Sequence, residues 1–474
     1  MKLLAPELLS PAEMGKADEA AIAGGAPGIA LMENAGRAVA RAVMRRFAPC
    51  RTLVLCGPGN NGGDGYITAR RLAEAGWPVA LASLAAPRPG TDAALAAARW
   101  RGPCADFSPA ASVRAELVID AVFGAGLARP VEGLVADTLC AARLVAAIDV
   151  PSGLDGANGT VLGYAPSAAL TVTFFRRKPG HVLLPGRLLC GALILAEIGI
   201  PPSVLETVHP RTFANGPALW RLPMPASDSH KWSRGHVTVL GGATMTGAAR
   251  LAAAGARRIG AGMVTIAAPA SAAPVYRVGA AGVIVSEAPL AELLQDARRQ
   301  VFVCGPGLGV DAARIALPAL LAAKRRIVVD ADALTAFAGS IAGLRGAAVL
   351  TPHEGEFARL FGTVGPNRLE AAREAARRTG AVVVLKGADT VIAAPDGWAA
   401  VNDSAPPDLA TAGTGDVLAG MIAGLLAQGL APREAASAGV FLHGAAAEAV
   451  GPGLIAEDLP QALPRVIASM RAQS

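Results

Sequence analysis

The sequence predicts an α/β protein with two domains, and three observations support this fold class. Short apolar segments of strand length alternate with Ala-rich segments of helical periodicity, which is typical of parallel, doubly wound sheets. Gly- and Asp-rich turns follow the apolar segments, where such sheets bind ligands. At 474 residues, the chain is longer than one typical domain.

The composition indicates a large core and a mild positive charge. Hydrophobic residues make up 53% and charged residues 17% of the chain, which excludes an intrinsically disordered protein. The 43 Lys and Arg against 37 Asp and Glu leave a net charge of +6, without long basic runs and with only 4% aromatic residues. A nucleic-acid partner is therefore not expected, whereas an anionic small-molecule substrate fits this charge.

The cysteines and the N-terminus favour a cytoplasmic location. The cysteines, at positions 50, 56, 104, 140, 190 and 304, form no CxxC pair and no Cys/His cluster, so reduced thiols are expected. The N-terminal stretch MKLLAPELLSPAEM is too short and too interrupted by prolines and acids for a signal peptide. No stretch offers about 18 uninterrupted apolar residues, and no membrane partner is expected.

The N-terminal half is predicted to form a Rossmann-like doubly wound sheet. Helices are expected within residues 11–47, and the segment GPGNNGGDGY (57–66) is expected to be a loop that leads into a helix ending near Ala75. The predicted strands are Thr52–Cys56, Val79–Leu84, Leu117–Ala121 and Leu144–Ile148.

Many prolines and a loss of periodicity between about Pro201 and Asp228 indicate a connection between domains. We predict a first domain over 1–212, a linker over 213–228 and a second domain over 229–474. The second domain repeats the α/β pattern, with helices over 247–259, 416–428 and 433–450. Its predicted strands are Val237–Leu240, Met263–Ala267, Val301–Cys304, Ile327–Val329, Ala348–Leu350 and Ala381–Leu385.

The glycine-rich stretch LATAGTGDVLAG (409–420) carries the strongest chemical signal. Its glycines permit close backbone approach to a ligand, and a helix starting at 414–416 would direct free N–H groups at an anion. An aspartate at this position would repel the anion that the loop attracts. Its presence therefore suggests a carboxylate base beside a phosphate site. The alternative is a glycine turn in which Asp416 caps the helix.

Oxygen-bearing side chains follow the strands of the N-terminal half. The segment GNNGGDG matches neither GxGxxG nor Walker A, because no lysine closes it and Asp64 lies inside it. One such residue alone is better explained by turn chemistry, but three such strand ends in one sheet favour a site. Hard cations prefer these oxygens, so a bound cation is a candidate. The residues are Asn60, Asn61, Asp64, Asp120, Asp149 and Ser152.

Four segments resemble the YjeF N-terminal family of NAD(P)H-hydrate epimerases, over about residues 10–200: LMENAGRAVA (31–40), CGPGNNGGDGYITAR (56–70), DAVFGAGLARPVEG (120–133) and AIDVPSGLDGANG (147–159). The resemblance implies a K⁺ ion held by Asn61, Asp120 and Ser152. It also implies that Asp149 is the acid/base residue at the hydrated nicotinamide carbon, whose R and S forms interconvert through an iminium-like cation. The implied dinucleotide-binding residues are Asn60, Asn61, Gly62, Gly63, Asp64, Gly124, Ala125, Gly126, Leu127, Ala128, Arg129, Pro130 and Asp149.

The second half resembles the YjeF C-terminal family, a ribokinase-like α/β/α fold of ADP/ATP-dependent NAD(P)H-hydrate dehydratases. The matching segments are HKWSRGHVTVLGG (230–242), GPGLG (305–309), DADAL (330–334), TPHEGE (351–356), VLKGADTVI (384–392) and the glycine-rich stretch. The resemblance implies that Asp416 is the base at the C6 hydroxyl and that Gly307 and His353 line the hydrate pocket. Nucleotide contacts are implied for Lys386, Gly387, Ala388, Asp389, Thr390 and Gly415.

The implied reaction uses a phosphoryl transfer to drive a dehydration. The C6 hydroxyl takes the terminal phosphate of ADP or ATP, with Mg²⁺, and the ring nitrogen then expels phosphate to restore NADH or NADPH. Glu354 stands where the family usually has proline, and two prolines within 403–408 replace a more usual glycine-bearing loop. Both departures concern substrate geometry.

A bifunctional repair enzyme for hydrated NADH and NADPH, acting as a homo-oligomer, is the predicted function. An alternative is a ribokinase-like small-molecule kinase whose N-terminal dinucleotide-binding module regulates it. Two further alternatives concern single residues. His353 could be structural, and Asp330 and Asp332 could hold a metal, although turn chemistry explains them better.

Overall fold

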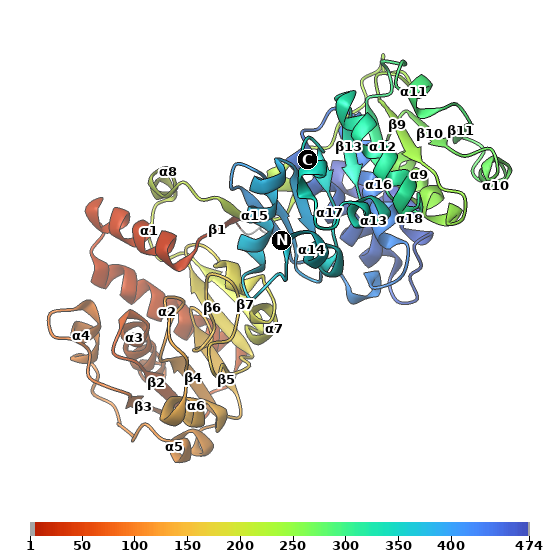
Figure 1. The fold of residues 1–474 in the computed structure, drawn as a ribbon. Helices are drawn as coiled ribbons and strands as arrows, with labels where there is room; N and C mark the ends of the chain where they lie inside the picture. The colour runs from red at the N-terminus through yellow and green to blue at the C-terminus, as the bar shows by residue number, and fades with distance from the viewer. Residues whose placement is uncertain (1–4, 473–474) are drawn as a thin grey trace. The chain divides into compact units, whose positions relative to one another are not determined.

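The computed structural model describes residues 5–472, and the chain forms two compact units (Figure 1). Unit 1 extends to Phe213 and unit 2 begins at Ala214. Each unit contains a sheet of mainly parallel strands with helices on its faces, so the predicted α/β fold class is confirmed.

The sheet of unit 1 is parallel throughout and has the order β3-β2-β4-β5-β6-β7. The predicted strands are present to within a residue, whereas the last two strands were not predicted. The chain order reverses between β2 and β4, which creates the crevice where open α/β sheets bind ligands. The strands are β2 (Thr52–Cys56), β3 (Val79–Ser83), β4 (Leu117–Ala121), β5 (Val145–Ile148), β6 (Leu170–Phe174) and β7 (Ala192–Ala196).

Helices cover both faces of this sheet because alternate strand residues point to opposite sides. In β2, Val54 and Cys56 join the core formed with α1, α2 and α3, whereas Leu53 and Leu55 join the core formed with α5 and α6. The helices are α1 (Pro11–Ala23), α2 (Gly28–Arg46), α3 (Asn60–Glu74), α4 (Asp92–Ala97), α5 (Pro109–Arg114), α6 (Gly133–Cys140), α7 (Gly186–Leu189) and α8 (Leu205–Val208). A short strand β1 (Glu7–Leu8) pairs with the start of β8 (Thr212–Ala214).

The segment predicted as a loop after β2 is the start of α3, which begins at Asn60. Its glycines are required by packing. A Cβ on Gly62 would lie 1.8 Å from the carbonyl oxygen of Gly57, and one on Gly65 would lie 2.5 Å from Cβ of Ala121. The glycines therefore let the first turns of α3 approach the ends of β2 and β4.

Unit 2 contains the strand order β17-β16-β15-β14-β13-β12-β9-β10-β11. The strands from β11 to β15 are parallel, and β16 and β17 add an antiparallel meander. The meander and β11 were not predicted. The bounds are β9 (His236–Leu240), β10 (Met263–Ala267), β11 (Ile284–Ser286), β12 (Val301–Cys304), β13 (Arg326–Val329), β14 (Val349–Leu350), β15 (Val382–Leu385), β16 (Thr390–Ala393) and β17 (Ala399–Asn402).

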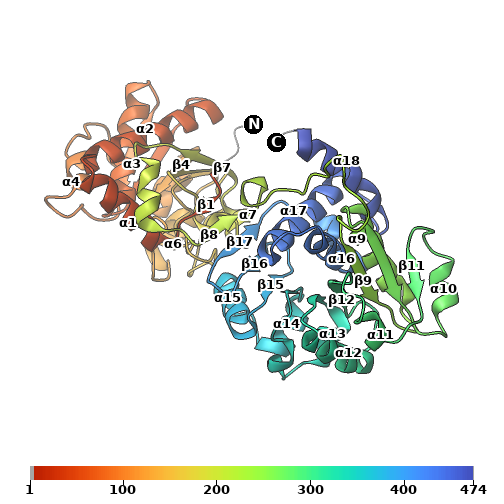
Figure 2. The ribbon, with the colours of Figure 1, turned by 90° about the horizontal axis from the view of Figure 1, so that it is seen from above.

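Figure 2 shows α9, α16, α17 and α18 on one side of this sheet and α12, α13 and α14 on the other. Helix α16 is apolar around its circumference because it lies between the sheet and the neighbouring helices α9 and α17. The helices are α9 (Thr246–Arg258), α10 (Ala273–Arg277), α11 (Leu290–Leu293), α12 (Val310–Ala322), α13 (Ala331–Ala336), α14 (Glu354–Phe361), α15 (Arg368–Thr379), α16 (Thr414–Ala427), α17 (Pro432–Val450) and α18 (Asp458–Ala472).

The first residues of the predicted linker are buried within unit 2. The Asn215 side chain donates hydrogen bonds to Oδ1 of Asn402, at 3.0 Å, and to the carbonyl oxygen of Ser437, at 2.9 Å. The ring of Trp220 packs against Phe441 at a centroid distance of 5.6 Å. The exact limits of the predicted domains and linker stay a prediction. Within residues 5–472, every helix is too short or too polar to cross a lipid bilayer.

The substitution Gly62→Ala is expected to destabilise unit 1. The added Cβ would overlap the backbone of Gly57, and overpacking costs about 1–3 kcal/mol, more than the ~1 kcal/mol that alanine gains over glycine in a helix. Gly59→Ala is the matched control, because a Cβ there meets nothing within 4 Å. Thermal unfolding should show a lower midpoint for Gly62→Ala alone, and equal midpoints would contradict the close packing.

Candidate active sites in the two units

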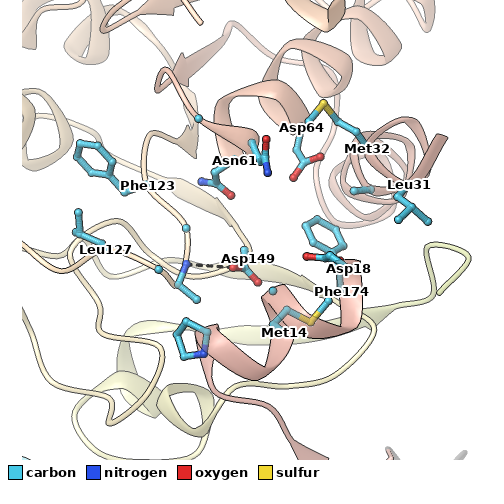
Figure 3. A pocket seen from close by; sticks show the side chains of 18 of the residues that line it. Met14, Asp18, Leu31, Met32, Asn61, Asp64, Phe123, Leu127, Asp149 and Phe174 are labelled. Carbon is cyan, nitrogen blue, oxygen red and sulfur yellow. Dashed lines mark hydrogen bonds between the residues drawn. The ribbon is translucent and has the colours of Figure 1, made fainter. Parts of the chain in front are cut away.

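A cavity of about 800 Å³ opens at the switch point of unit 1 (Figure 3). Most of the predicted dinucleotide-binding residues line it, whereas Gly62, Gly63 and Pro130 do not. Gly62 and Gly63 are buried in the packing of α3 instead. The predicted residues in the lining are Asn60, Asn61, Asp64, Gly124, Ala125, Gly126, Leu127, Ala128, Arg129 and Asp149.

Asp149 lies directly after β5 and reaches into this cavity with a backbone φ of 65°. One carboxylate oxygen accepts hydrogen bonds from Nζ of Lys178, at 2.6 Å, and from Oγ1 of Thr173, at 2.9 Å. The other accepts from the backbone N–H of Ala125, at 3.1 Å. Burial acts to raise the pKa of Asp149, but Lys178 and the other donors outweigh it and hold the pKa below its usual value. Asp149 is therefore ionised at neutral pH.

His181 fixes the backbone around this ion pair. Its Nδ1 accepts a hydrogen bond from the backbone N–H of Lys178, at 2.8 Å, so the proton is on Nε2, which lies 2.8 Å from the carbonyl oxygen of Asp149. Burial lowers the pKa of His181 to about 4, in agreement with a neutral ring. Lys178 and His181 were not predicted as site residues, although they occur in the sequence FFRRKPGH.

Two further carboxyl groups face the cavity, from α1 and α3 (Figure 3). Burial, together with the nearby charges of Asp149 and Asp18, raises the pKa of Asp64 well above its usual value. Burial also raises the pKa of Asp18 to about 6. Asp18 was missed because a single acid in an amphipathic helix has no sequence pattern that distinguishes it from a surface residue.

Asp120 and Ser152, which were predicted as cation ligands, meet behind the cavity wall. The buried carboxylate of Asp120 accepts hydrogen bonds from the backbone N–H and the hydroxyl of Ser152, at 2.8 and 2.6 Å. Burial raises the pKa of Asp120, and none of the ion pairs found among residues 5–472 involves it. Nδ2 of Asn61 is buried without a hydrogen-bond partner among the same residues.

The candidate site of unit 2 is built around Asp416, in the first turn of α16. Lys386 lies close to Gly415, the residue before Asp416, because a Cβ on Gly415 would be 3.2 Å from Nζ of Lys386. Lys386 forms an ion pair with Asp330 at 2.9 Å. Burial and the charge of Asp330 raise the pKa of Asp416 to about 6. Burial acts to lower the pKa of Lys386, but Asp330 and Glu356 outweigh it and raise the pKa, so Lys386 is cationic.

Neighbouring loops hold the start of α16 in place. The Thr414 hydroxyl donates hydrogen bonds to the carbonyl oxygens of Leu409 and Thr411, both at 3.0 Å. Nε2 of His443 lies 2.9 Å from the carbonyl oxygen of Thr414, and burial lowers the pKa of His443 to about 4. A neutral His443 therefore donates this hydrogen bond and fixes the N-terminus of α16.

The predicted nucleotide-binding residues form the turn between β15 and β16. The Thr390 hydroxyl donates a hydrogen bond of 2.7 Å to the carbonyl oxygen of Gly387, which closes the turn. Gly387 and Ala388 are exposed, whereas Asp389 is buried and forms an ion pair with Arg368 at 3.4 Å. Asp389 therefore shapes the turn from within. Arg368 was not predicted and also donates to the carbonyl oxygen of Lys386, at 2.6 Å.

Gly307 and His353 lie on two other loops at the carboxyl ends of the strands. Gly307 has a φ of 62°, and its carbonyl oxygen would be 1.9 Å from a Cβ on Gly242. His353 caps α14, because its Nδ1 accepts a 3.0 Å hydrogen bond from the backbone N–H of Gly355. Glu354 begins that helix, at the first helical position, where proline is also favourable.

Asp330 and Asp332 make separate contacts. Asp330 pairs with Lys386, and Oδ2 of Asp332 accepts a 2.8 Å hydrogen bond from the backbone N–H of Gly309. Across the part of the chain that the structure describes, no group of three or more His, Cys, Asp or Glu residues could hold a metal ion.

Comparisons with known proteins agree with this division. Residues 28–180 match the family model described as YjeF-related protein N-terminus, and residues 237–467 match the model described as NAD(P)H-hydrate dehydratase. The chain is 38% identical to the bifunctional NAD(P)H-hydrate repair enzyme Nnr of Moorella thermoacetica, over 98% of this chain and 97% of that protein. The chain belongs to the family of bifunctional NAD(P)H-hydrate repair enzymes.

The family resemblance predicted from the motifs is thereby confirmed over both units. The repair enzyme Nnr of Escherichia coli is 33% identical over 92% of this chain and 89% of its own length. A crystal structure of the ADP/ATP-dependent NAD(P)H-hydrate dehydratase from Bacillus subtilis, co-crystallised with ATP and Mg²⁺, is 32% identical. It covers 52% of this chain and 94% of its own, with a TM-score of 0.47.

The substitution Lys178→Met is expected to raise the pKa of Asp149, because it removes the cation that holds the buried carboxylate ionised. Carbon-13 NMR of labelled aspartate carboxyls should show Asp149 taking up its proton at higher pH than in the wild type. The control Lys16→Met removes an exposed lysine of α1. An unchanged Asp149 titration in Lys178→Met would contradict this description of the ion pair.

Proposed function

We propose that the chain repairs hydrated NADH and NADPH by two reactions in series, one in each unit. Unit 1 interconverts the R and S hydrates, and unit 2 dehydrates the S form at the expense of ADP or ATP. The observation that carries the proposal is a carboxyl group at the carboxyl end of the sheet in each unit, Asp149 and Asp416, beside a lysine. The family membership of the whole chain supports the same assignment.

In unit 1, Asp149 is proposed as the acid/base residue at the hydrated carbon. A cavity of about 800 Å³ is within the range of ligand sites and suits one end of a dinucleotide. Lys178 keeps the Asp149 carboxylate ionised, so it accepts a proton and stabilises a cationic ring as the hydroxyl departs. The backbone of residues 124–129 and the side chains of Asn60 and Asn61 would orient the substrate.

Asp120 and Ser152, behind the cavity wall, and Asn61, in its lining, are the proposed ligands of a K⁺ ion. Asp120 is a buried carboxylate without a cationic partner among residues 5–472. The buried amide of Asn61 has an unpartnered atom, and exchanging its oxygen and nitrogen by a flip would present an oxygen ligand there. Asp120, Asn61 and Ser152 would hold the ion, which would order the turn at 122–124 and supply no redox chemistry.

In unit 2, Asp416 is proposed to take the proton from the C6 hydroxyl. The hydroxyl oxygen attacks the terminal phosphorus of the nucleotide, and the bond to the departing AMP or ADP breaks. The ring nitrogen lone pair then expels phosphate from C6, and loss of a ring proton restores the reduced nicotinamide. The free N–H groups at the start of α16 and Lys386 would stabilise the phosphate charge.

Lys386, Gly387, Thr390 and Gly415 are the proposed phosphate and nucleotide contacts, with Gly387 and Ala388 exposed for binding. Asp389 would act indirectly, through Arg368. Because the described residues include no protein cluster for a metal, Mg²⁺ would enter with the phosphates, as it commonly does. When bound, it neutralises charge between the transferring oxygens.

Recovery of NADH tests the proposal directly. Purified protein with both NADHX epimers, ADP and Mg²⁺ should regenerate the nicotinamide absorbance completely. Asp149→Ala should recover only the S fraction, apart from spontaneous epimerisation, and Asp416→Ala should stop NADH formation. Formation of a stable phosphate ester without NADH would instead indicate a small-molecule kinase, and no reaction with either nucleotide would contradict the proposal.

The dehydratase step should depend on pH through Asp416. The carboxylate of Asp416 is the active form. With S-NADHX as substrate, kcat/KM should therefore rise about tenfold per pH unit below pH about 6 and stay constant at higher pH. Lys386→Met removes the cation that stabilises the carboxylate, so the rise should move to higher pH. A pH-independent rate across this range would contradict the assignment of Asp416 as the base.

A further inference from the structure

Helix α1 brings one carboxyl group, that of Asp18, into the wall of the unit 1 cavity. Its start is fixed by a capping box, in which Ser10 and Glu13 satisfy each other's backbone N–H groups. One helical face lines the cavity at positions 11, 14, 15, 18 and 22. The adjacent face, with Ala17 and Ala21, is buried in the core, so the direction of Asp18 is set by packing.

The surroundings of Asp18 provide no structural reason for a carboxyl group. Met14, Met32, Leu31 and Phe174 lie around it in the cavity wall (Figure 3). Its carboxyl makes no hydrogen bond to the other described residues. Removing a carboxylate from water without a partner is unfavourable, and an apolar side chain would fill this position better.

The second residue that points into the same cavity is Asp149, from the turn after β5 (Figure 3). The pKa of Asp18 is also influenced by the charges of Lys178, Asp149 and Glu19. The carboxyl group of Asp64 faces Asp18 from α3. Only Asp149 is bound directly to Lys178, so the two carboxyl groups differ in partners although they share one cavity.

We propose that Asp18 is the second catalytic residue of the epimerase reaction and exchanges a proton with the C6 hydroxyl of the hydrate, while Asp149 acts on the water that adds to the other face. The proposal rests on the epimerase function proposed above. It concerns a residue outside the segment matched by the N-terminal family model, which begins at residue 28.

The step balances without any further reactant. Protonated Asp18 donates its proton to the C6 hydroxyl, the C6–O bond breaks, water leaves, and the N1 lone pair forms the C6=N1 iminium. A water molecule then adds to the other face of C6, and the Asp149 carboxylate takes its proton. Asp18 ends ionised and Asp149 protonated, and the reverse conversion or exchange with solvent restores both groups. The opposite protonation states are the arrangement that acid/base pairs require.

The distinct environments of the two groups supply these states. Burial raises the pKa of Asp18 to about 6, and a general acid is most effective when its pKa lies close to the working pH. The pKa of Asp149, in contrast, lies below its usual value. The acid form of Asp18 is lost as pH rises through about 6. The epimerase rate should therefore fall above that pH if Asp18 is the donor.

The test measures conversion of pure R-NADHX into the S form by chromatography, without ADP and after subtraction of the buffer rate. Asp18→Asn should lower the rate by about 10²–10⁴-fold and remove the decline above pH 6. Asp18→Glu should restore part of the rate, and Glu19→Gln, which removes the exposed neighbouring acid, should match the wild type. Dehydration of S-NADHX with ADP, the reaction of unit 2, should be unchanged in every variant, and a cooperative thermal unfolding transition of unit 1 in each variant reports its correct folding.

Two results would overturn the assignment: an Asp18→Asn variant as fast as the wild type, or a slow variant that keeps the decline above pH 6. The second result would mean that Asp18 has a structural role and that another group titrates. A wild-type protein that does not exceed the buffer rate would overturn the epimerase function itself, and with it the role of Asp18.

Discussion

The proposed chemistry of both units depends on the desolvation of carboxyl groups at the carboxyl ends of the two sheets. Burial disfavours the charged form of every one of them, and the local partners then decide the outcome. Asp149 has a lysine at 2.6 Å and stays ionised. Asp416 shares its surroundings with other acids, and its pKa rises to about 6. One physical constraint thus yields two candidate proton-transfer groups with different properties.

Close packing of small residues places these groups. In unit 1, Gly62 and Gly65 let α3 approach the strand ends. In unit 2, a Cβ on Gly420 would lie 1.9 Å from the carbonyl oxygen of Ala252, so α9 and α16 contact each other through their backbones. The position of Asp416 is consequently set by a helix that is buried on all sides. Such rigid support suits a catalytic group, because small displacements cost large factors in rate.

Much of the fold and part of the site could be predicted from the sequence. The strands that end in Asp120 and Asp149 were predicted because continuous apolar runs followed by turn residues define buried parallel strands. The strands β16 and β17 were missed, although the turn signal Pro395-Asp396-Gly397 lies between them, because each strand has only four residues. The GNNGGDG segment was taken for a loop, since glycine disfavours helix unless tertiary packing requires it.

The residues that tune the site could not be predicted, because their effect is spatial. Lys178 is 29 residues from Asp149 in the sequence, and it follows two arginines that obscure its role. The importance of Asp18 and Arg368 likewise depends on the residues that they face in the folded protein, which the sequence does not show. Motifs predicted the candidate catalytic groups, whereas the groups that set their charge and direction depend on the fold.

Mixing two variants, each inactive in one unit, tests most directly whether the two units carry separate reactions in series. Asp149→Asn should retain dehydration, and Asp416→Asn should retain epimerisation. With pure R-NADHX, ADP and Mg²⁺, neither variant alone should form NADH faster than spontaneous epimerisation permits, whereas their mixture should recover it at a rate near that of the wild type. A mixture no faster than the Asp149→Asn variant alone would contradict the claim.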